Sequence, residues 1–229
     1  MRAASTSGEQ MAKRRVAILI SGRGSNMAAL LAAARSKDFP AEIALVLSNR
    51  PAAKGLAAAR EAGLATAIVD HTRFGQDREA FERALQAELE KQQIDILCLA
   101  GFMRLLTPWL VSRWHGRMLN IHPALLPAFK GLDTHARALA AGVKIHGATV
   151  HFVIPEMDSG PVIAQGALAV RDDDTPDTLA ARVLALEHRI YPAALRLVAE
   201  ERVRVVDGRC VIDGAPVSDH VLLVPADEA

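Results

Sequence analysis

The chain has 229 residues, of which 51% are hydrophobic and 4% aromatic, and its formal net charge is +1. This length supplies one sizeable hydrophobic core, or at most two small domains. The near-neutral charge and the few aromatic residues argue against a nucleic-acid or anionic membrane surface, although a local patch would still suffice for a small anionic ligand. No run approaches the roughly 18 apolar residues of a membrane span, so we expect no membrane partner.

The N-terminal segment has basic residues but neither the apolar region nor the cleavage signal of a secretory peptide. Residues 1–14 are therefore predicted to be a flexible tail. Cys98 lies inside an apolar run and Cys210 stands apart from it, so we expect no structural disulfide and a reducing, cytoplasmic compartment. The sequence shows no Cys/His cluster of the metal-binding type, and we expect no metal.

The first part of the chain alternates short apolar runs with helical patterns. Strands are predicted at residues 16–21, 42–49, 65–71 and 94–100, and helices at residues 26–35, 54–63 and 77–92. This alternation is typical of βαβ units and of a parallel sheet that is covered on both faces.

The pattern changes after residue 100. We predict a short helix at 108–114, a strand at 117–122, a helix at 133–141, strands at 145–154 and 161–170, a helix at 175–201 and a hairpin at 203–214 with Gly208 and Arg209 at its turn. Only a short loop joins the strands at 145–154 and 161–170, so they are expected to pair antiparallel. The fold class predicted is α/β: a single domain over residues 15–229 with a Rossmann-like three-layer fold, a mainly parallel central sheet and antiparallel strands in the C-terminal half.

The segment SGRGSN, residues 21–26, follows the first predicted strand and opens the first predicted helix. Its glycines let backbone N–H groups approach a ligand, and a helix N-terminus favours an anion, so the segment suits a phosphate. It is not a Walker loop, because the lysine is missing, and Met27 stands where the dinucleotide motif has its third glycine. A tight turn with Ser25 or Asn26 as the helix cap explains the same residues equally well.

The segment LNIHPALLP, residues 119–127, ends a predicted strand and contains two prolines that stop regular structure. Asn120 and His122 are two residues apart, so they face one side of the strand while Ile121 faces the core. Ligands collect at the carboxyl ends of parallel strands. An amide that binds an oxyanion beside an imidazole that moves a proton suits acyl chemistry. The alternative is a packed histidine and a turn-forming asparagine.

Asp158, in the loop PEMDSG, offers a carboxylate to this pair. A carboxylate near His122 would raise the pKa of the imidazole by stabilising its charged form. Taken alone, Asp-Ser-Gly is an ordinary turn. His135 near a helix start and His151 within a strand are weaker candidates, and we expect His151 to be packed. No serine or cysteine lies in a nucleophile-elbow pattern, so any acyl transfer is expected to be direct.

Six motifs occur in order along the chain: VAILISGRGSN, LAGFMRLLTPWLV, LNIHPALLPAFKGLDTH, HGATVHFV, MDSGPVIAQ and RVLALEHRIYP. Together, over residues 16–205, they resemble the phosphoribosylglycinamide formyltransferase family, the folate-dependent enzymes of purine biosynthesis. Formyltetrahydrofolate hydrolases and methionyl-tRNA formyltransferases share the Asn-x-His and Asp core. The hydrolases carry a preceding regulatory domain, and the tRNA enzymes a C-terminal domain and a basic character, neither of which we expect here. The GRGSN segment favours a phosphorylated small substrate.

The resemblance implies that the formyl group of 10-formyltetrahydrofolate, a cosubstrate, passes directly to the amino group of 5′-phosphoribosylglycinamide through a tetrahedral intermediate. Asn120 would stabilise the oxyanion, His122 would move a proton, and Asp158 would pair with His122. The implied partners are these small molecules alone, with no nucleic acid and a monomeric or homodimeric protein. The resemblance also divides the domain into a phosphate-binding half at about residues 15–115, a folate-binding and catalytic half at about 116–206, and a terminal hairpin and tail at 203–229.

The family motifs imply two further sets of binding residues. The ribonucleotide would be held by Gly24, Ser25, Asn26 and Glu187. The folate would be held by Arg78, Met103, Arg104, Leu105, Leu106, Asn120, Ile154, Pro155, Glu156, Met157 and Asp158.

Two positions depart from the family pattern. Arg23 stands where a bacterial relative has a small polar residue, and it either adds a phosphate contact or points into solvent. Asp133 stands where some relatives have a histidine, which removes an imidazole contact. Two other functions compete with the transferase: a formyltetrahydrofolate hydrolase, in which water replaces the amine, and a non-catalytic folate- or nucleotide-binding domain. GRGSN argues against the first, and the set Asn120, His122 and Asp158 argues against the second.

Overall fold

The computed structural model describes residues 12–214 and 222–224, which form a seven-stranded sheet and a separate two-stranded hairpin. The sheet order is β3-β2-β1-β4-β5-β6-β7. The large sheet contains β1 (Arg14–Ile20), β2 (Ala41–Ser48), β3 (Thr66–Ile68), β4 (Ile96–Leu99), β5 (Met118–His122), β6 (Ile145–Phe152) and β7 (Val162–Ala169). The hairpin contains β8 (Val203–Val206) and β9 (Arg209–Ile212).

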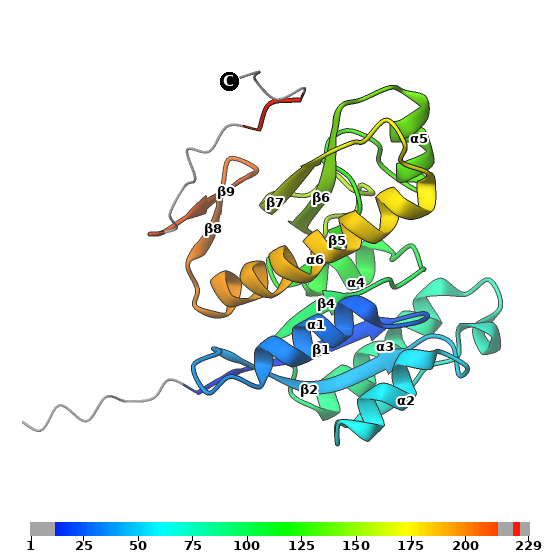
Figure 1. Cartoon of the computed structure of the whole chain (residues 1–229). Coiled ribbons are helices and arrows are strands. Elements are labelled where there is room, and N and C mark those ends of the chain that lie inside the picture. Colours follow the sequence, from blue (N-terminus) through cyan, green and yellow to red (C-terminus); the bar gives the residue numbers. More distant parts are fainter. Residues whose placement is uncertain (1–11, 215–221, 225–229) are drawn as a thin grey trace, which may run out of the picture.

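The first five strands pair in parallel, whereas β6 is antiparallel to β5 and β7 is antiparallel to β6. The predicted α/β fold class, with its mainly parallel sheet and antiparallel C-terminal strands, is therefore confirmed (Figure 1). The helical elements are α1 (Ser25–Ala34), α2 (Lys54–Glu61), the 3-10 helix η1 (His71–Phe74), α3 (Arg78–Lys91), α4 (Pro108–Arg113), α5 (Thr134–Ala140) and α6 (Pro176–Ala199).

Strand β1 shows why the molecule has three layers. Its residues alternate between two hydrophobic clusters, with Val16, Ile18 and Ile20 in one and Ala17 and Leu19 in the other. All five are 0% exposed. Because a strand presents alternate side chains to opposite faces, a continuous apolar run requires cover on both sides.

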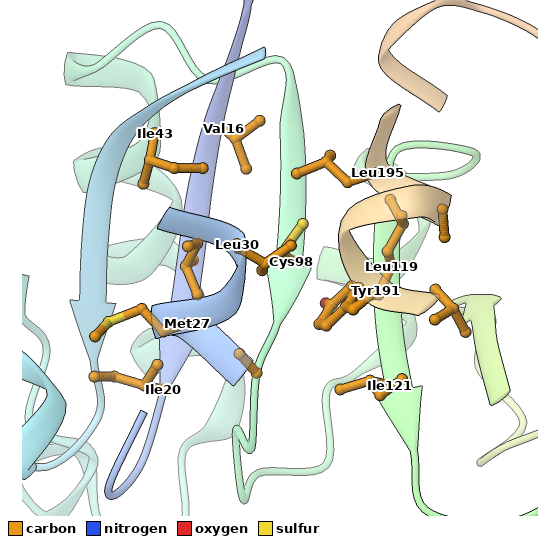
Figure 2. Close-up of a cluster of buried hydrophobic side chains, with 14 of the residues drawn as sticks. Val16, Ile20, Met27, Leu30, Ile43, Cys98, Leu119, Ile121, Tyr191 and Leu195 are labelled. Carbon is orange, nitrogen blue, oxygen red and sulfur yellow. The ribbon is translucent and has the colours of Figure 1, made fainter. Parts of the chain in front are cut away.

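Helices α1 and α6 supply one cover, and α3 and α4 supply the other. In Figure 2, Met27 and Leu30 of α1 and Tyr191 and Leu195 of α6 point onto the sheet above Val16 and its neighbours. The opposite cluster is filled by side chains of α3 and α4, among them Phe81, Leu85, Leu89 and Leu110.

Helix α6 begins as the sequence predicts, with Thr175 as N-cap in a capping box with Thr178. Near its other end, the Tyr191 hydroxyl lies 3.1 Å from the Leu99 carbonyl and 3.2 Å from the Leu119 carbonyl. Burial raises the pKa of Tyr191 well above its ordinary value, so the hydroxyl keeps the proton that it donates. This contact attaches α6 to the last residue of β4 and to the beginning of β5.

Two boundaries in the first half of the chain differ from the sequence expectation. Strand β1 begins two residues early, because Arg14 pairs with Ala41, so Arg14 is not in the predicted tail. Strand β3 is shorter than predicted, and His71 begins a 3-10 helix instead. Residues 1–11, which make up most of the predicted tail, lie outside the described residues.

The prediction that Gly208 and Arg209 form the turn of the terminal hairpin is wrong. The turn residues are Asp207 and Gly208, with φ of 49° and 73°, while Arg209 pairs with Val206 in β9. A two-residue turn with positive φ at both positions matches the twist of its strands, and Asp-Gly is a favoured sequence for it.

Both cysteines are free, with Cys98 buried and Cys210 half-buried. Packing of Cys98 in the core is as the sequence predicts. Within residues 12–214 and 222–224, no helix combines the length and the apolarity that crossing a bilayer requires.

The Tyr191 contact generates a stability prediction. Tyr191→Phe keeps the ring but removes the hydroxyl that donates to the Leu99 and Leu119 carbonyls, so we expect a loss of about 1 kcal/mol in the free energy of unfolding. Tyr191→Leu also removes packing and is expected to lose about 3 kcal/mol. Urea unfolding measures both. A Phe variant with the wild-type midpoint and slope would show that the hydroxyl does not stabilise the fold.

Candidate active site

The candidate site lies at the carboxyl edge of the sheet, where β1, β4 and β5 are neighbours. The chain runs from β1 outward to β2 and β3, then returns to place β4 on the other side of β1. Such a switch in strand order leaves a crevice between the loops that follow the two central strands, and ligands of open α/β sheets bind there. The loops after β1 and β4 meet here, since the Ser21 amide donates to the Gly101 carbonyl at 3.2 Å.

Gly24, Ser25 and Asn26 lie where the sequence places them, at the start of α1. Gly24 is the N-cap, in a left-handed conformation with φ 78°, which glycine adopts without strain. The first helical hydrogen bond runs from Ala28 N to Gly24 O, so the preceding amides are free of helical partners and form an anion-attracting end.

Asn26 and Glu187 are brought together from distant parts of the sequence. Both are buried, and Asn26 Nδ2 donates to Glu187 Oε2 at 2.6 Å. Burial raises the pKa of the Glu187 carboxyl, while the hydrogen bond from Asn26 opposes that shift. Asn26 Oδ1 is buried without a hydrogen-bond partner among the described residues.

Asn120 and His122 lie on one face of β5, and Ile121 packs in the core on the other. His122 Nε2 lies 3.0 Å from the Phe129 carbonyl, which only accepts, so this nitrogen carries a proton. His122 Nδ1 lies 3.4 Å from Asp158 Oδ2, and the Gly131 amide donates to the same oxygen at 2.8 Å. The carboxylate of Asp158 therefore faces the Nδ1 side of the ring, while the Phe129 carbonyl faces the Nε2 side.

His151 is a site residue that the sequence reasoning assigned to packing. It is opposite Asn120 in the register of β5 and β6. Its Nδ1 donates to the Phe152 carbonyl at 2.9 Å, which leaves Nε2 to accept from Asn120 Nδ2 at 3.2 Å and to lie 3.9 Å from Asp158 Oδ1. Burial lowers the pKa of His151, which favours this neutral, accepting form. Only the strand register reveals this contact, because the two residues are far apart in the sequence.

The predicted folate residues lie in two loops and at one helix start. Arg78 begins α3, and its Nη2 donates to the Leu105 carbonyl at 2.6 Å. Met103 and Leu105 are 62% and 64% exposed, and Arg104 and Leu106 are partly buried. Exposed apolar side chains beside a guanidinium suit a flat ring that carries a carboxylate tail.

The loop that contains Asp158 is attached to the loop after β5. Lys130 Nζ donates to Ser159 Oγ at 2.6 Å, and the Gly131 amide binds Asp158 as described above. Ile154 is half-buried, whereas Pro155, Glu156 and Met157 are exposed. These contacts join Asp158 to His122, Asn26 to Glu187 and Arg78 to Leu105, as three groups along one sheet edge.

Asp133, which departs from the family pattern, and His135, a weaker candidate, do not join these groups. Asp133 is the N-cap of α5, with φ 56°, and its side chain makes no capping hydrogen bond. His135 stacks edge to face on His146, with ring centroids 5.4 Å apart. Burial lowers the pKa of His135 and lowers that of His146 to about 4, so both rings are neutral at physiological pH.

The comparison with protein families agrees with this geometry. A family model described as formyl transferase matches residues 14–195, which include all three groups. The chain therefore belongs to the formyl transferase family, as the sequence motifs predict.

Comparison with individual proteins shows which members of the family this chain is similar to. The chain is 42% identical to phosphoribosylglycinamide formyltransferase of Escherichia coli, over 87% of this chain and 93% of that protein. It is 47% identical to the trifunctional purine biosynthetic protein adenosine-3 of Bos taurus over 86% of this chain, but the match covers only 19% of that protein. The chain thus spans about a fifth of the length of the trifunctional relative.

Solved structures give the same result. Glycinamide ribonucleotide transformylase 1 from Symbiobacterium toebii superposes with a TM-score of 0.84 at 44% identity, covering 87% of this chain and 94% of that one. A formyltetrahydrofolate deformylase from Pseudomonas syringae superposes with a TM-score of 0.81 at 28% identity, covering 89% of this chain and 67% of that one. The fold alone is therefore common to transferases and a deformylase, and the site must separate them.

The Asn26–Glu187 pair generates a pH prediction. In the folded state the pKa of Glu187 is raised above its ordinary value of 4.5. At a pH between the ordinary and the raised pKa, the folded protein holds a proton that the unfolded chain has lost. The free energy of unfolding therefore falls as the pH rises through this range. Glu187→Gln removes this titration but keeps an oxygen that accepts from Asn26. We expect the variant to match the wild type at about pH 3.5 and to be more stable at about pH 8.

Urea unfolding at the two pH values tests this expectation. Glu61→Gln is the matched control, because Glu61 is an exposed residue of α2. Equal differences from the wild type at both pH values for Glu187→Gln would contradict the raised pKa.

Proposed function

We propose that this chain transfers the formyl group of 10-formyltetrahydrofolate to the amino group of 5′-phosphoribosylglycinamide, a step of purine biosynthesis. The observation that carries the proposal is the meeting of Asn120, His122 and Asp158 at the end of β5, with distances of 3.4 Å from His122 to Asp158 and 3.2 Å from Asn120 to His151. The names of the relatives supply the substrate and the pathway.

The acceptor side of the proposed site is the start of α1. Its unpaired amides suit the phosphate of the ribonucleotide, and this is the role that we assign to Gly24, Ser25 and Asn26. Glu187 is the carboxylate of the same region and has a free oxygen beyond the one that Asn26 binds. We assign it to the ribose hydroxyls, which donate to such an oxygen.

The donor side lies beyond β4 and β5. Folate, when bound, supplies the formyl group. The apolar side chains of Met103, Leu105 and Met157 are exposed, with fractions of 62%, 64% and 52%, and suit the faces of its pterin ring. The remaining folate residues proposed from the family motifs are Arg78, Arg104, Leu106, Ile154, Pro155 and Glu156.

The proposed chemistry is addition of the amine to the formyl carbon followed by loss of the folate nitrogen. As the new C–N bond forms, the formyl oxygen takes negative charge, and Asn120 Nδ2 donates to it with the hydrogen that His151 does not accept. The amine must lose a proton and the departing nitrogen must gain one. His122 moves this proton, and Asp158 stabilises its charged form. Atoms and charge balance without a covalent intermediate on the protein.

A hydrolase is the alternative, since a deformylase shares the fold. It needs water instead of the amine at the formyl carbon, and it has no use for a phosphate cradle at α1 or for the buried Asn26–Glu187 pair. These two features favour the transferase.

An assay with and without the amine tests the reaction. We expect release of tetrahydrofolate from 10-formyltetrahydrofolate to require 5′-phosphoribosylglycinamide and to be followed by the absorbance of the folate product. Release at the same rate without the amine would identify a hydrolase, and absence of release in both mixtures would exclude both enzymes.

A substitution at the carboxylate tests the proton relay. Asp158→Asn keeps the size of the side chain but removes the charge that stabilises His122, so we expect kcat to fall about 100- to 10,000-fold while folate binding is retained. Steady-state kinetics and folate titration measure the two effects. Asp172→Asn is the matched control, because Asp172 is a surface carboxylate with a side chain 92% exposed. Turnover in Asp158→Asn equal to that of the control would disprove the role.

A further inference from the structure

A second polar cavity lies beside the phosphate cradle, where the loop after β1 meets the start of α2. Its volume is about 270 Å³. It is lined by Ser21, Gly22, Arg23, Arg50, Ala52, Ala53 and Lys54. Of these, only Arg23 was noted in the sequence as a departure with two possible roles, and none belongs to the three groups of the candidate site.

Three of the lining residues are cations without carboxylate partners in the part of the chain that is described. Arg23, Arg50 and Lys54 are exposed. Other lysines and arginines of the described residues also have no ion pair, but Arg23, Arg50 and Lys54 differ from them because they line one cavity. Because the chain as a whole carries only +1, this cluster is a local concentration of positive charge and not part of a generally basic surface.

The backbone adds to the same positive field. Helix α2 begins at Lys54, has no acidic residue in its first turn, and its N-cap Ala53 offers no side-chain acceptor. The N-terminus of a helix carries partial positive charge, so it disfavours a lysine and favours an anion. A lysine at the start of a helix is locally unfavourable, and such features are common at sites where a bound ligand compensates for them.

Two glycines allow the backbone segments that carry the cations to pack closely. The Gly55 amide donates to the Gly22 carbonyl at 3.0 Å. A Cβ atom at Gly55 would lie 2.6 Å from Ile20 Cδ1 and 3.3 Å from Gly24 Cα, so a side chain here would displace Ile20 and crowd the backbone of Gly24. The starts of α1 and α2 are therefore packed together, and the two helix ends contribute their fields to neighbouring points.

We propose that Arg23, Arg50 and Lys54 form a second anion subsite that binds a phosphate-type dianion, next to but separate from the cradle at Ser25 and Asn26. The cavity is smaller than the roughly 300–1,000 Å³ pockets that enclose drug-sized ligands, so it takes a single anionic group and not a whole nucleotide. Guanidinium groups bind phosphate through paired hydrogen bonds, and the lysine adds a point charge.

The subsite takes free inorganic phosphate, because the proposed function assigns the single phosphate of the acceptor substrate to the cradle. That assignment rests on the proposed function, whereas the subsite itself does not. A binding experiment without any reaction therefore tests the subsite even if the proposed reaction is wrong.

The experiment is a titration of the ¹⁵N-labelled full chain with inorganic phosphate at low ionic strength, followed by NMR. The amides of Gly22 and Ala53 report on the cavity, and those of Ser25 and Asn26 report on the cradle. We expect the dissociation constant from the cavity amides to rise about fivefold for each of Arg23→Gln, Arg50→Gln and Lys54→Gln, and about a hundredfold in the triple variant. Lys37→Gln is the matched control, because Lys37 is an exposed lysine that does not line the cavity.

The outcomes separate the possibilities. Cavity amides that do not shift in the wild type, or a triple variant with the dissociation constant of the control, would overturn the subsite. If phosphate binding weakens and the KM for 5′-phosphoribosylglycinamide rises with it, the phosphate of the acceptor occupies these residues, and the proposal of a separate subsite is overturned. If phosphate binding weakens and that KM is unchanged, free phosphate is the ligand. Absence of turnover refutes the proposed reaction, but the phosphate titration still tests the subsite.

Discussion

The antiparallel pairing of β6 with β5 is the constraint on which the candidate site depends. Its register places His151 opposite Asn120 and Thr149 opposite His122. His151 can then accept a hydrogen bond from Asn120, and this contact orients the amide. The Thr149 hydroxyl donates to the Ala124 carbonyl at 2.7 Å and accepts from the Leu126 amide at 3.0 Å, which holds the loop after β5. A shift of one residue would turn all of these side chains to the other face of the sheet.

Two buried polar side chains fix the loop after β4. Ser21 accepts from the Met103 amide at 2.8 Å, and the buried Glu82 accepts from the Thr107 amide at 2.6 Å, so both ends of the loop after β4 are attached to the body of the fold. A buried polar group that loses its partner costs about 1–3 kcal/mol, so such attachments are difficult to displace. The loop can thus present exposed apolar side chains to a ligand while its backbone stays in place.

Electrostatics divides the same edge into two regions. At the end of β5, a carboxylate lies 3.4 Å from an imidazole, an arrangement that can hold and release a proton. Near the end of β1, two helix N-termini and unpaired cations produce a positive field that attracts anions. The crossover between β1 and β4 separates the two regions. Under the proposed function, an anionic acceptor would be drawn to one side of the crevice, while proton transfer would occur on the other.

Much of the fold follows from the sequence alone, because period-two and period-3.6 patterns record which side chains must be buried. The continuous apolar run of β1, the Thr175-Pro176 helix start and the glycine after β1 are local signals, and each is found where it was predicted. The family was also identified correctly from its motifs. The hairpin turn was misplaced by one residue, because alternation alone does not distinguish the Asp207-Gly208 turn from the next register.

The sequence by itself determined the residues to which we assign the chemistry: Asn120 and His122 on one strand face, Asp158 in a loop, and a glycine segment at a helix start. Only the tertiary structure decided their partners. The role of His151, the Asn26–Glu187 hydrogen bond and the cluster of Arg23, Arg50 and Lys54 depend on strand register and on the packing of helix ends. These contacts join residues that are distant along the chain, and no local pattern encodes the distance between them.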